Sequence, residues 1–340
     1  MNSRMLGGLS PRAFMRRYWQ KRLLFVPNAL PQFNAMVDMR ALAALAARDD
    51  VESRMVERRS GEWNTTHGPF RRVVVRKSNW TLLVSGVNLH VLAAERLLRC
   101  FSFIPQARLD DVMVSHATPG GGVGPHIDSY DVFLVQGAGR RRWRVGRKTF
   151  LAQPGDLLYL PPGLEHDGVA LDACTTYSVG FRAPRGAELG AAFLDWLHER
   201  GLPDAVYRDP GLAPVARPAL VPARMLDFAE RLVSRVRWSR GDVADFLGRY
   251  LSAPKPHVVF RASGSRGKMV RLDAKTQLLY LGGRFFINGE SFTVAEAAVL
   301  RRLADRREMD RASLAPVAGL IAEWQRAGYV HFTRKAEIDG

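Results

Sequence analysis

The residues with the clearest chemistry are a histidine and an aspartate two positions apart, His126 and Asp128, in the stretch GPHIDSYD. Residues i and i+2 of a β-strand face the same side, so the imidazole and the carboxylate would project together. His166 lies further along, in LEHDG, at the start of another strand-like segment. Two histidines and one carboxylate on one face of an octahedron leave positions open for a cosubstrate and dioxygen, as in non-haem Fe(II) oxygenases. These residue types and their spacing predict an Fe(II) site at His126, Asp128 and His166.

A nearby arginine is a candidate for binding the cosubstrate. Dioxygen chemistry at such a site needs further electrons, which 2-oxoglutarate commonly supplies as it decarboxylates, and this dianion needs a cation for its distal carboxylate. In RRRWRV, alternation places Arg141, Trp143 and Val145 on one face and the other three arginines on the opposite face. Burying three arginines together is unfavourable, so the face with Trp143 is the inner one. Arg141 is therefore predicted to point inward, where its planar guanidinium can bind a carboxylate.

The elements that would position these residues are short β-strands. Strand-like segments fill most of the first half of the chain: LLFVP, RRVVVRK, WTLLVSGV, ARLDDVMVSHA, YDVFLVQ, RRWRVG, KTFLAQ, DLLYLPP and TTYSVGFRA. Glycine- and proline-rich turns such as TPGGGVGP and QPGD separate them. This pattern predicts a barrel or double-sheet jelly roll, the class that includes cupins. We expect this domain to cover residues 1–184 and to open with a short helix that Ser10 and Pro11 begin.

The rest of the chain is predicted to form two smaller units. GAELGAAFLDWLHERG, ARMLDFAERLVSRVRW and DVADFLGRYLS are typical of helices and define a helical region over residues 185–257. From residue 258, strands with GG and NG turns precede two helices, the first with Thr293 and Glu296 as a capping box. This order predicts a winged-helix-like domain over residues 258–340. The fold class is therefore α+β.

Composition limits the class of protein. The chain has 340 residues, a formal net charge of +17 and only two cysteines, which lie far apart and predict neither a disulfide framework nor a structural zinc site. No apolar run approaches the length of a membrane span and the N-terminus lacks the core of a signal peptide, so we expect a cytoplasmic protein without membrane contact. The excess of arginine fits a nucleic-acid face, a ribosome-associated role or a coding bias. Its scatter along the chain favours a solvated surface.

Three of these stretches resemble one known family. GGGVGPHIDSYDVFLVQGAGRRRWRVG, PGDLLYLPPGLEH and TYSVGFRAP are similar to the bacterial ribosomal oxygenases of the JmjC cupin superfamily. Those enzymes are Fe(II)- and 2-oxoglutarate-dependent arginine hydroxylases of large-subunit ribosomal protein number sixteen. They combine a double-stranded β-helix (the cupin/JmjC jelly roll), a helical dimerisation region and a C-terminal winged helix. The resemblance implies Fe(II), 2-oxoglutarate and O2, a ribosomal protein substrate, proximity to the ribosome and its rRNA, and a homodimer.

The resemblance also assigns roles to individual residues. The iron ligands fall on His126, Asp128 and His166. Contacts to the 2-oxoglutarate carboxylate fall on Arg141 and Ser115, with Thr176 lining the same pocket. The pocket for the target arginine falls on Asp111, Met113, Tyr130 and Ser178. A carboxylate that pairs with a guanidinium, with a thioether and an aromatic ring against its stem, fits that role.

The chain departs from the family pattern in one connection. Between RRWRVG and PGDLLYLPP, residues 146–154 are shorter than the family's connection. Loops tolerate deletions, so we expect the barrel to close. Two alternatives stay open: hydroxylation of a histidine in another ribosomal protein, and a catalytically inactive cupin binding module, which would follow if the missing residues supplied a strand beside the iron.

Overall fold

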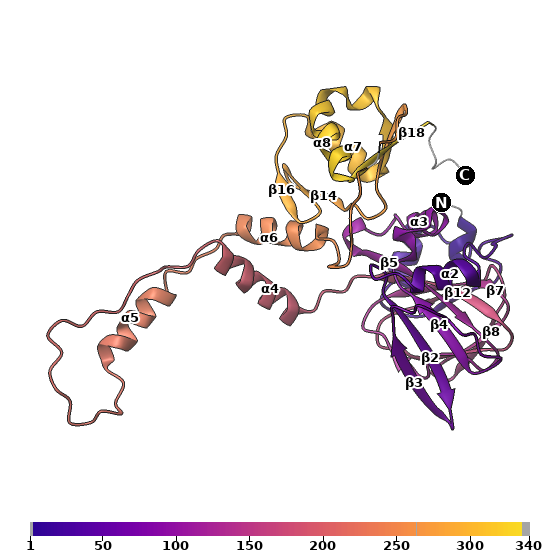
Figure 1. Cartoon of the computed structure of the whole chain (residues 1–340), viewed down its shortest axis with the longest axis horizontal. Coiled ribbons are helices and arrows are strands. Elements are labelled where there is room, and N and C mark those ends of the chain that lie inside the picture. Colours follow the sequence, from indigo (N-terminus) through magenta and orange to yellow (C-terminus); the bar gives the residue numbers. More distant parts are fainter. Residues whose placement is uncertain (1–2, 263, 335–340) are drawn as a thin grey trace.

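A computed structural model describes residues 3–262 and 264–334 of the chain. Figure 1 shows a β-rich body made by the first half of the chain, an arm of helices that extends away from it, and a small C-terminal unit of strands and helices. The order of elements agrees with the predicted α+β class. Among the described residues, no helix combines the length and the apolar character needed to cross a bilayer.

The β-rich body consists of two antiparallel sheets. One has eight strands in the order β1-β10-β7-β12-β5-β4-β2-β3, and the other has four in the order β6-β11-β8-β9. The larger sheet contains β1 (Leu24–Val26), β2 (Ser53–Arg59), β3 (Glu62–His67), β4 (Trp80–Val84), β5 (Leu109–Ala117), β7 (Val132–Ala138), β10 (Leu157–Leu160) and β12 (Cys174–Phe181). The smaller contains β6 (His126–Ile127), β8 (Arg141–Val145), β9 (Lys148–Ala152) and β11 (Glu165–Ala170). This is the predicted jelly roll.

Helices cover the outer face of the larger sheet. They are η1 (Ser3–Leu6), α1 (Pro11–Arg17), α2 (Met39–Ala46), η2 (Val87–Leu89), α3 (Leu92–Arg99) and η3 (Gln106–Arg108). The Ser10 side chain accepts a hydrogen bond from the N–H of Ala13 at 3.2 Å, which confirms the predicted start of α1. Phe14 of α1 packs its ring 5.5 Å from Phe133 and 5.0 Å from Tyr159. The strand neighbours of these two residues, Leu134 and Leu158, face the space between the sheets, so both faces are buried.

The predicted strand at residues 71–77 is wrong. This segment is an exposed loop, with Val74 and Val75 each nearly half exposed. One side of β2 pairs with β3 along its whole length. The other side of β2 pairs with β4. The segment stays at the surface, and its Arg76 contacts β2 through an ion pair, with Nε 3.2 Å from Glu57 Oε1.

The helical arm has two parts that differ in burial. It consists of α4 (Gly186–Glu199), α5 (Ala223–Val233) and α6 (Arg240–Ser252). No residue of α5 is buried, and Leu226 and Val233 are 65% and 70% exposed. In contrast, α6 packs on the C-terminal unit, where Arg249 Nη2 donates to Ser291 Oγ at 2.6 Å. The arm therefore begins at the jelly roll, projects outward at α5 and returns through α6 (Figure 1).

The C-terminal unit has two small sheets, β17-β13-β18 and β14-β15-β16. Its elements are β13 (Met269–Leu272), β14 (Leu278–Leu281), β15 (Arg284–Ile287), β16 (Glu290–Phe292), α7 (Ala297–Arg306), β17 (Glu308–Asp310), η4 (Ala312–Val317), α8 (Ala318–Ala327) and β18 (Val330–Thr333). Leu300 of α7 and Trp324 of α8 belong to its core. The predicted capping box is wrong, because α7 begins only at Ala297 and Glu296 occupies the cap position without a side-chain hydrogen bond. Thr293 lies too early in the chain to cap this helix.

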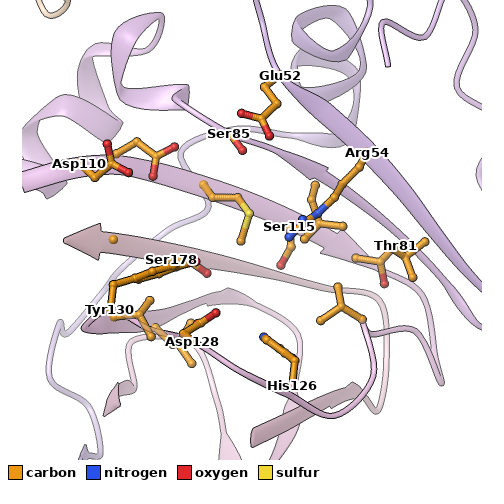
Figure 2. A pocket seen from close by; sticks show the side chains of 18 of the residues that line it. Glu52, Arg54, Thr81, Ser85, Asp110, Ser115, His126, Asp128, Tyr130 and Ser178 are labelled. Carbon is orange, nitrogen blue, oxygen red and sulfur yellow. The ribbon is translucent and has the colours of Figure 1, made fainter. Parts of the chain in front are cut away.

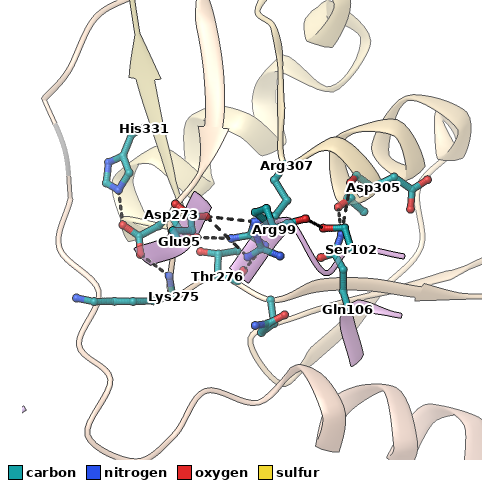
Figure 3. Close-up of polar contacts among 12 residues, drawn as sticks. Glu95, Arg99, Ser102, Gln106, Asp273, Lys275, Thr276, Asp305, Arg307 and His331 are labelled. Carbon is teal, nitrogen blue, oxygen red and sulfur yellow. Dashed lines mark hydrogen bonds and ion pairs between the residues drawn. The ribbon is translucent and has the colours of Figure 1, made fainter. Parts of the chain in front are cut away.

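A buried charge cluster joins the C-terminal unit to the jelly roll (Figure 3). Glu95 of α3 forms ion pairs with Arg99 at 3.7 Å and with Arg307, at the end of α7, at 3.6 Å. Arg307 also donates to the carbonyl oxygens of Thr276 and Asp273 at 2.8 and 2.7 Å. These contacts hold the C-terminal unit, and with it the linker after α6, against the jelly roll.

Candidate metal and cosubstrate site

The three predicted metal ligands converge between the two sheets. His126 lies on β6, Asp128 follows it directly, and His166 lies on β11. β6 and β11 pair antiparallel with His166 directly opposite His126, so the histidines, distant in sequence, become cross-strand neighbours. One ligand atom from each of the three residues lies within 4.8 Å of the others. His166 Nε2 lies 3.7 Å from Asp128 Oδ2, a spacing that a shared metal ion can bridge.

The outer nitrogens of both imidazoles are held by backbone carbonyls. His126 Nδ1 lies 2.9 Å from the carbonyl oxygen of Gly124, and His166 Nδ1 lies 3.0 Å from that of Leu164. A carbonyl only accepts, so each Nδ1 carries the proton and each Nε2 presents a lone pair. Burial lowers the pKa of His166, which favours the neutral imidazole that binds metals. The donor set and its tautomers therefore fit a divalent transition metal.

Gly124 is required where the turn before His126 passes Trp63. Its φ of +82° is in the left-handed region, and a Cβ there would lie 2.8 Å from the Trp63 ring. The glycine therefore lets the Gly124 carbonyl approach His126.

The triad opens into a cavity of about 500 Å³ whose walls come from both sheets. Figure 2 shows His126 and Asp128 facing Ser115, with Asp110 toward one end and Thr81 toward the other. Alternation along β5 places Asp111, Met113 and Ser115 in a row on this wall. At the rise of a β-strand, this row is about 13 Å long. The cavity therefore has room for two small groups placed on either side of the triad.

We call one end the arginine end, made by Arg141, Ser115 and Thr81. Arg141 is only 5% exposed, and Nη1 lies 3.5 Å from Ser115 Oγ. Its Nε and Nη2 are buried and find no hydrogen-bond acceptor among the described residues, and the same holds for Thr81 Oγ1. A buried guanidinium without an anion is unfavourable, so this end is built for a negatively charged group. The predicted inward orientation of Arg141 is confirmed, since Arg142 and Arg144 are exposed.

Thr176 lies beside this end without lining the cavity. It is directly opposite Ser115 in the β5–β12 pairing, and its hydroxyl donates to Gln136 Oε1 at 3.0 Å. The Gln136 amide in turn donates to the carbonyl oxygens of Ala138 and Gly139 at 2.8 and 3.2 Å. Thr176 therefore lies on the same face of the larger sheet as Ser115, next to it on the neighbouring strand.

We call the other end the acidic end, made by Asp110, Asp111 and Lys255. Asp111 Oδ2 accepts a hydrogen bond from the N–H of Gly86 at 2.8 Å, and burial raises the pKa of its carboxyl group. Lys255 Nζ lies 3.2 Å from Asp110 Oδ1 and 3.9 Å from Asp111 Oδ2. Tyr130 lines the same region, and its pKa is raised to about 12 by burial and by the charge of Asp128, so its hydroxyl keeps its proton. Met113 and Ser178, opposite each other in the sheet, complete this part of the wall.

Several polar lining residues were not assigned to the site from the sequence, and four of them bear on its chemistry. They are Glu52, Arg54, Thr81 and Lys255. Thr81 lies in the fully buried strand WTLLV, where no alternation distinguishes the cavity face. Lys255 lies in the linker APKPH after α6, outside the jelly roll. No local pattern in either segment points to the cavity.

The short connection at residues 146–154 still supplies a strand. Residues Lys148–Ala152 form β9, which pairs with β8 at the edge of the smaller sheet. β11, with His166, lies between β6 and β8 and is paired on both sides. The shortened connection therefore leaves the strand of the third candidate ligand inside the sheet.

Comparisons with known proteins extend this picture. A family model described as a JmjC domain matches residues 96–153 and 148–189, and one described as a ROXA-like winged helix matches residues 235–331. A ribosomal protein uL16 3-hydroxylase of Escherichia coli (strain K12) is 35% identical over 327 residues, which cover 86% of this chain and 87% of that protein. A probable ribosomal oxygenase of Haemophilus influenzae is 36% identical over 208 residues, 53% of this chain and 52% of that protein.

Solved structures are similar along nearly the whole chain. YcfD, a ribosomal oxygenase from Escherichia coli, in complex with cobalt and 2-oxoglutarate, has a TM-score of 0.80 and 32% identity, covering 95% of this chain and 98% of that one. A complex of the same protein with cobalt and succinic acid gives the same values. The likeness therefore includes the jelly roll, the helical arm and the C-terminal unit.

Proposed function

The chain belongs to the family of JmjC-domain ribosomal oxygenases, and on that premise we propose that it hydroxylates an arginine side chain of ribosomal protein uL16, using Fe(II), 2-oxoglutarate and O2. It is a metal- and 2-oxoglutarate-dependent oxygenase with a cupin fold. The observation that carries the proposal is one cavity in which His126, Asp128 and His166 converge between the buried guanidinium of Arg141 and the carboxylate of Asp111.

His126, Asp128 and His166 would hold the iron. Two imidazole nitrogens and one carboxylate oxygen on one side of the ion are the donor set that suits Fe(II) and leaves other positions open. When bound, ferrous iron activates dioxygen with electrons drawn from the decarboxylation of 2-oxoglutarate to succinate. The carbonyls of Gly124 and Leu164 keep the ligand nitrogens unprotonated and the rings in place.

Arg141 and Ser115 would bind the distal carboxylate of 2-oxoglutarate. A carboxylate can accept from both Nε and Nη2 of Arg141, the two donors that lack acceptors in the described part of the chain. Ser115 holds Nη1 of the same guanidinium, and the Thr81 hydroxyl supplies a further donor. Thr176 would support this wall from the neighbouring strand, through its position directly opposite Ser115.

Asp111, Met113, Tyr130 and Ser178 would bind the target side chain. The Asp111 carboxylate pairs with a guanidinium, while Met113 and the Tyr130 ring lie against an aliphatic stem. A histidine target would offer this carboxylate only a largely neutral imidazole near pH 7, a weaker partner than a guanidinium group. The acidic end therefore favours arginine over histidine.

The helical arm would make the protein a homodimer. Several large apolar side chains of the arm are exposed, among them Leu194, Leu226, Val233 and Trp238. Burying such a surface against a second copy stabilises both arms. We propose the division 1–184, 185–257 and 258–340 for the JmjC domain, the dimerisation region and the winged helix. A ribosomal protein substrate would place the activity in the cytoplasm, close to rRNA.

Anaerobic reconstitution followed by mass spectrometry tests this function. The protein is loaded with Fe(II) and 2-oxoglutarate, mixed with arginine-containing peptides of uL16 from its own ribosome, and exposed to air. We expect a gain of one oxygen atom on arginine, with one succinate formed per hydroxylation. Histidine-containing peptides of other ribosomal proteins serve as the comparison. Oxygen gain on histidine alone would overturn the choice of target. If no succinate forms from 2-oxoglutarate, the protein is not an oxygenase and the alternative of a binding module holds.

A further inference from the structure

Lys255 reaches the acidic end from outside the jelly roll. It lies in the linker after α6, between Pro254 and Pro256, yet its side chain lines the cavity together with Asp110 and Asp111. Proline on both sides restricts the backbone of this residue and of its neighbours. Arg182 adds a second anchor, because its Nη1 donates to the carbonyl oxygen of Leu251 at the end of α6, at 2.7 Å. The position of Lys255 is therefore fixed by its backbone, and its long side chain is the part that can move.

The charges at this end are already balanced. Lys255 Nζ lies 3.2 Å from Asp110 and 3.9 Å from Asp111, while Arg182 Nε lies 3.4 Å from Asp110. Glu52 and Arg54 line the same cavity and add one charge of each sign. A target arginine would therefore bring an additional cation to carboxylates that already have one, and like charges a few ångströms apart repel each other.

We propose that Lys255 is a specificity-determining residue, an internal ammonium group that occupies the cation position of the target and must be displaced from Asp111 when an arginine side chain enters. This inference rests on the proposed function. The Lys255 side chain is 35% exposed, so solvent is available to it once displaced. Asp110 can retain Arg182 after the exchange.

The chemistry of the two cations explains the selectivity. An ammonium group is a strongly hydrated point charge, whereas guanidinium is planar, more weakly hydrated and able to donate two parallel hydrogen bonds to one carboxylate. A target arginine can therefore displace Lys255 from Asp111. A target lysine would form no stronger interaction with the carboxylate than Lys255 does, and a neutral side chain would bring no charge to it. Lys255 thus restricts binding at Asp111 to target side chains that interact with this carboxylate more strongly than Lys255 does.

Two substitutions of opposite chemistry test the proposal. Lys255→Met removes the competing charge and keeps the length, and Lys255→Arg replaces it with a stronger competitor. The dissociation constant of an arginine-containing uL16 peptide is measured without 2-oxoglutarate, at pH 8, to favour the ionised form of Asp111. KM and kcat are then measured with all cosubstrates. Lys148→Met, which changes an exposed lysine on β9, is the control.

The two variants are expected to shift the affinity for the peptide in opposite directions. Lys255→Met should lower the dissociation constant and KM for the peptide by about three- to tenfold with little change in kcat, the effect of removing a partly exposed ion pair. It should also reduce the preference for arginine over lysine at the target position. Lys255→Arg should weaken binding by a similar factor. If Lys255 has only a structural role, Lys255→Met should bind the peptide more weakly and Lys255→Arg should bind it like wild type. That result would overturn the proposal, and so would unchanged peptide binding in both variants.

Failure of this inference differs from failure of the proposed function. If the wild-type protein hydroxylates no arginine peptide of uL16, the proposed function fails before the variants are compared. If it does so and the Lys255 variants bind like wild type, the lysine proposal alone fails. If Lys255→Met does not fold, as judged by its thermal unfolding midpoint, Lys255→Arg alone still tests the proposal. Weaker peptide binding by Lys255→Arg supports displacement of Lys255 by the target, and wild-type binding supports a structural role for Lys255.

Discussion

The two ends of the cavity differ in whether their charged side chains already have partners. At the arginine end, Arg141 is buried with two N–H donors that have no acceptor among residues 3–262 and 264–334. At the acidic end, Asp110 and Asp111 already have Lys255 and Arg182 as ion-pair partners within 4.0 Å. The first end gains an interaction when an anion binds, whereas the second must exchange one cation for another. The comparison predicts tight binding of the cosubstrate and selective, weaker binding of the target.

The largest effect is expected at the triad that separates the two ends. His166→Ala removes a candidate ligand and should lower turnover by more than about a hundredfold, since even residues that only support metal ligands are worth up to that much. Succinate formation and Co(II) binding measure the effect. His67→Ala, which changes an exposed histidine at the end of β3, should behave like wild type. If His166→Ala still binds Co(II) as wild type does, the site is elsewhere.

The next largest effect is expected at the arginine end. Arg141→Met should raise KM for 2-oxoglutarate by about a hundredfold, because a buried charge pair loses one partner. The same change removes an unpaired buried cation, so without cosubstrate it should leave the protein equally stable or raise its free energy of unfolding by about 1 to 3 kcal/mol. Arg142→Met, on the exposed face of the same strand, is the matched control. Weaker 2-oxoglutarate binding with a lower unfolding midpoint would point to a structural role.

A smaller effect is expected at the acidic end. Asp111→Asn should raise KM for the target peptide by about ten- to a hundredfold, the value of a charge-assisted hydrogen bond, and leave KM for 2-oxoglutarate unchanged. Asp49→Asn, at an exposed position, is the control. A rise in both KM values would mean that the two ends do not act separately.

The smallest effect is a difference in pH dependence between the ends. Burial raises the pKa of Asp111, so its carboxyl group stays protonated to a higher pH than a free carboxyl group does. Only the ionised form attracts guanidinium. Affinity for the target peptide should therefore be complete above the raised pKa and fall below it toward the affinity of the Asp111→Asn variant. Peptide binding measured from pH 8 to 5 without 2-oxoglutarate checks this, and an unchanged affinity over the range in which Asp111 titrates by NMR contradicts it.

The sequence predicts His126, Asp128 and Arg141 better than the contact between Lys255 and Asp111, for a physical reason. His126 and Asp128 share a strand face, and Arg141 follows from the alternation of RRRWRV, so both features are local. The pairing of His166 with His126 depends on β6 and β11 being neighbours, which no local pattern encodes. Lys255 reaches Asp111 only because α6 and the C-terminal unit dock on the jelly roll through contacts such as Glu95 with Arg307. A residue placed by docking leaves no periodic signal in its own segment.

The errors in the prediction have the same origin. Residues 71–77 have the composition of a strand, but they form an exposed loop, while β3 and β4 pair with the two sides of β2. Thr293 and Glu296 have the spacing of a capping box, but α7 begins after them. Both segments are locally compatible with the predicted element, and tertiary neighbours determine the outcome.

A titration of the Co(II)-loaded protein with 2-oxoglutarate, followed by visible absorption, tests most directly whether one cavity holds metal and cosubstrate together. We expect one Co(II) per chain and a spectral change that saturates at one 2-oxoglutarate per chain, with saturation shifted to much higher concentration in Arg141→Met. Binding of 2-oxoglutarate that leaves the Co(II) spectrum unchanged would contradict the account, because the anion would then lie away from the metal.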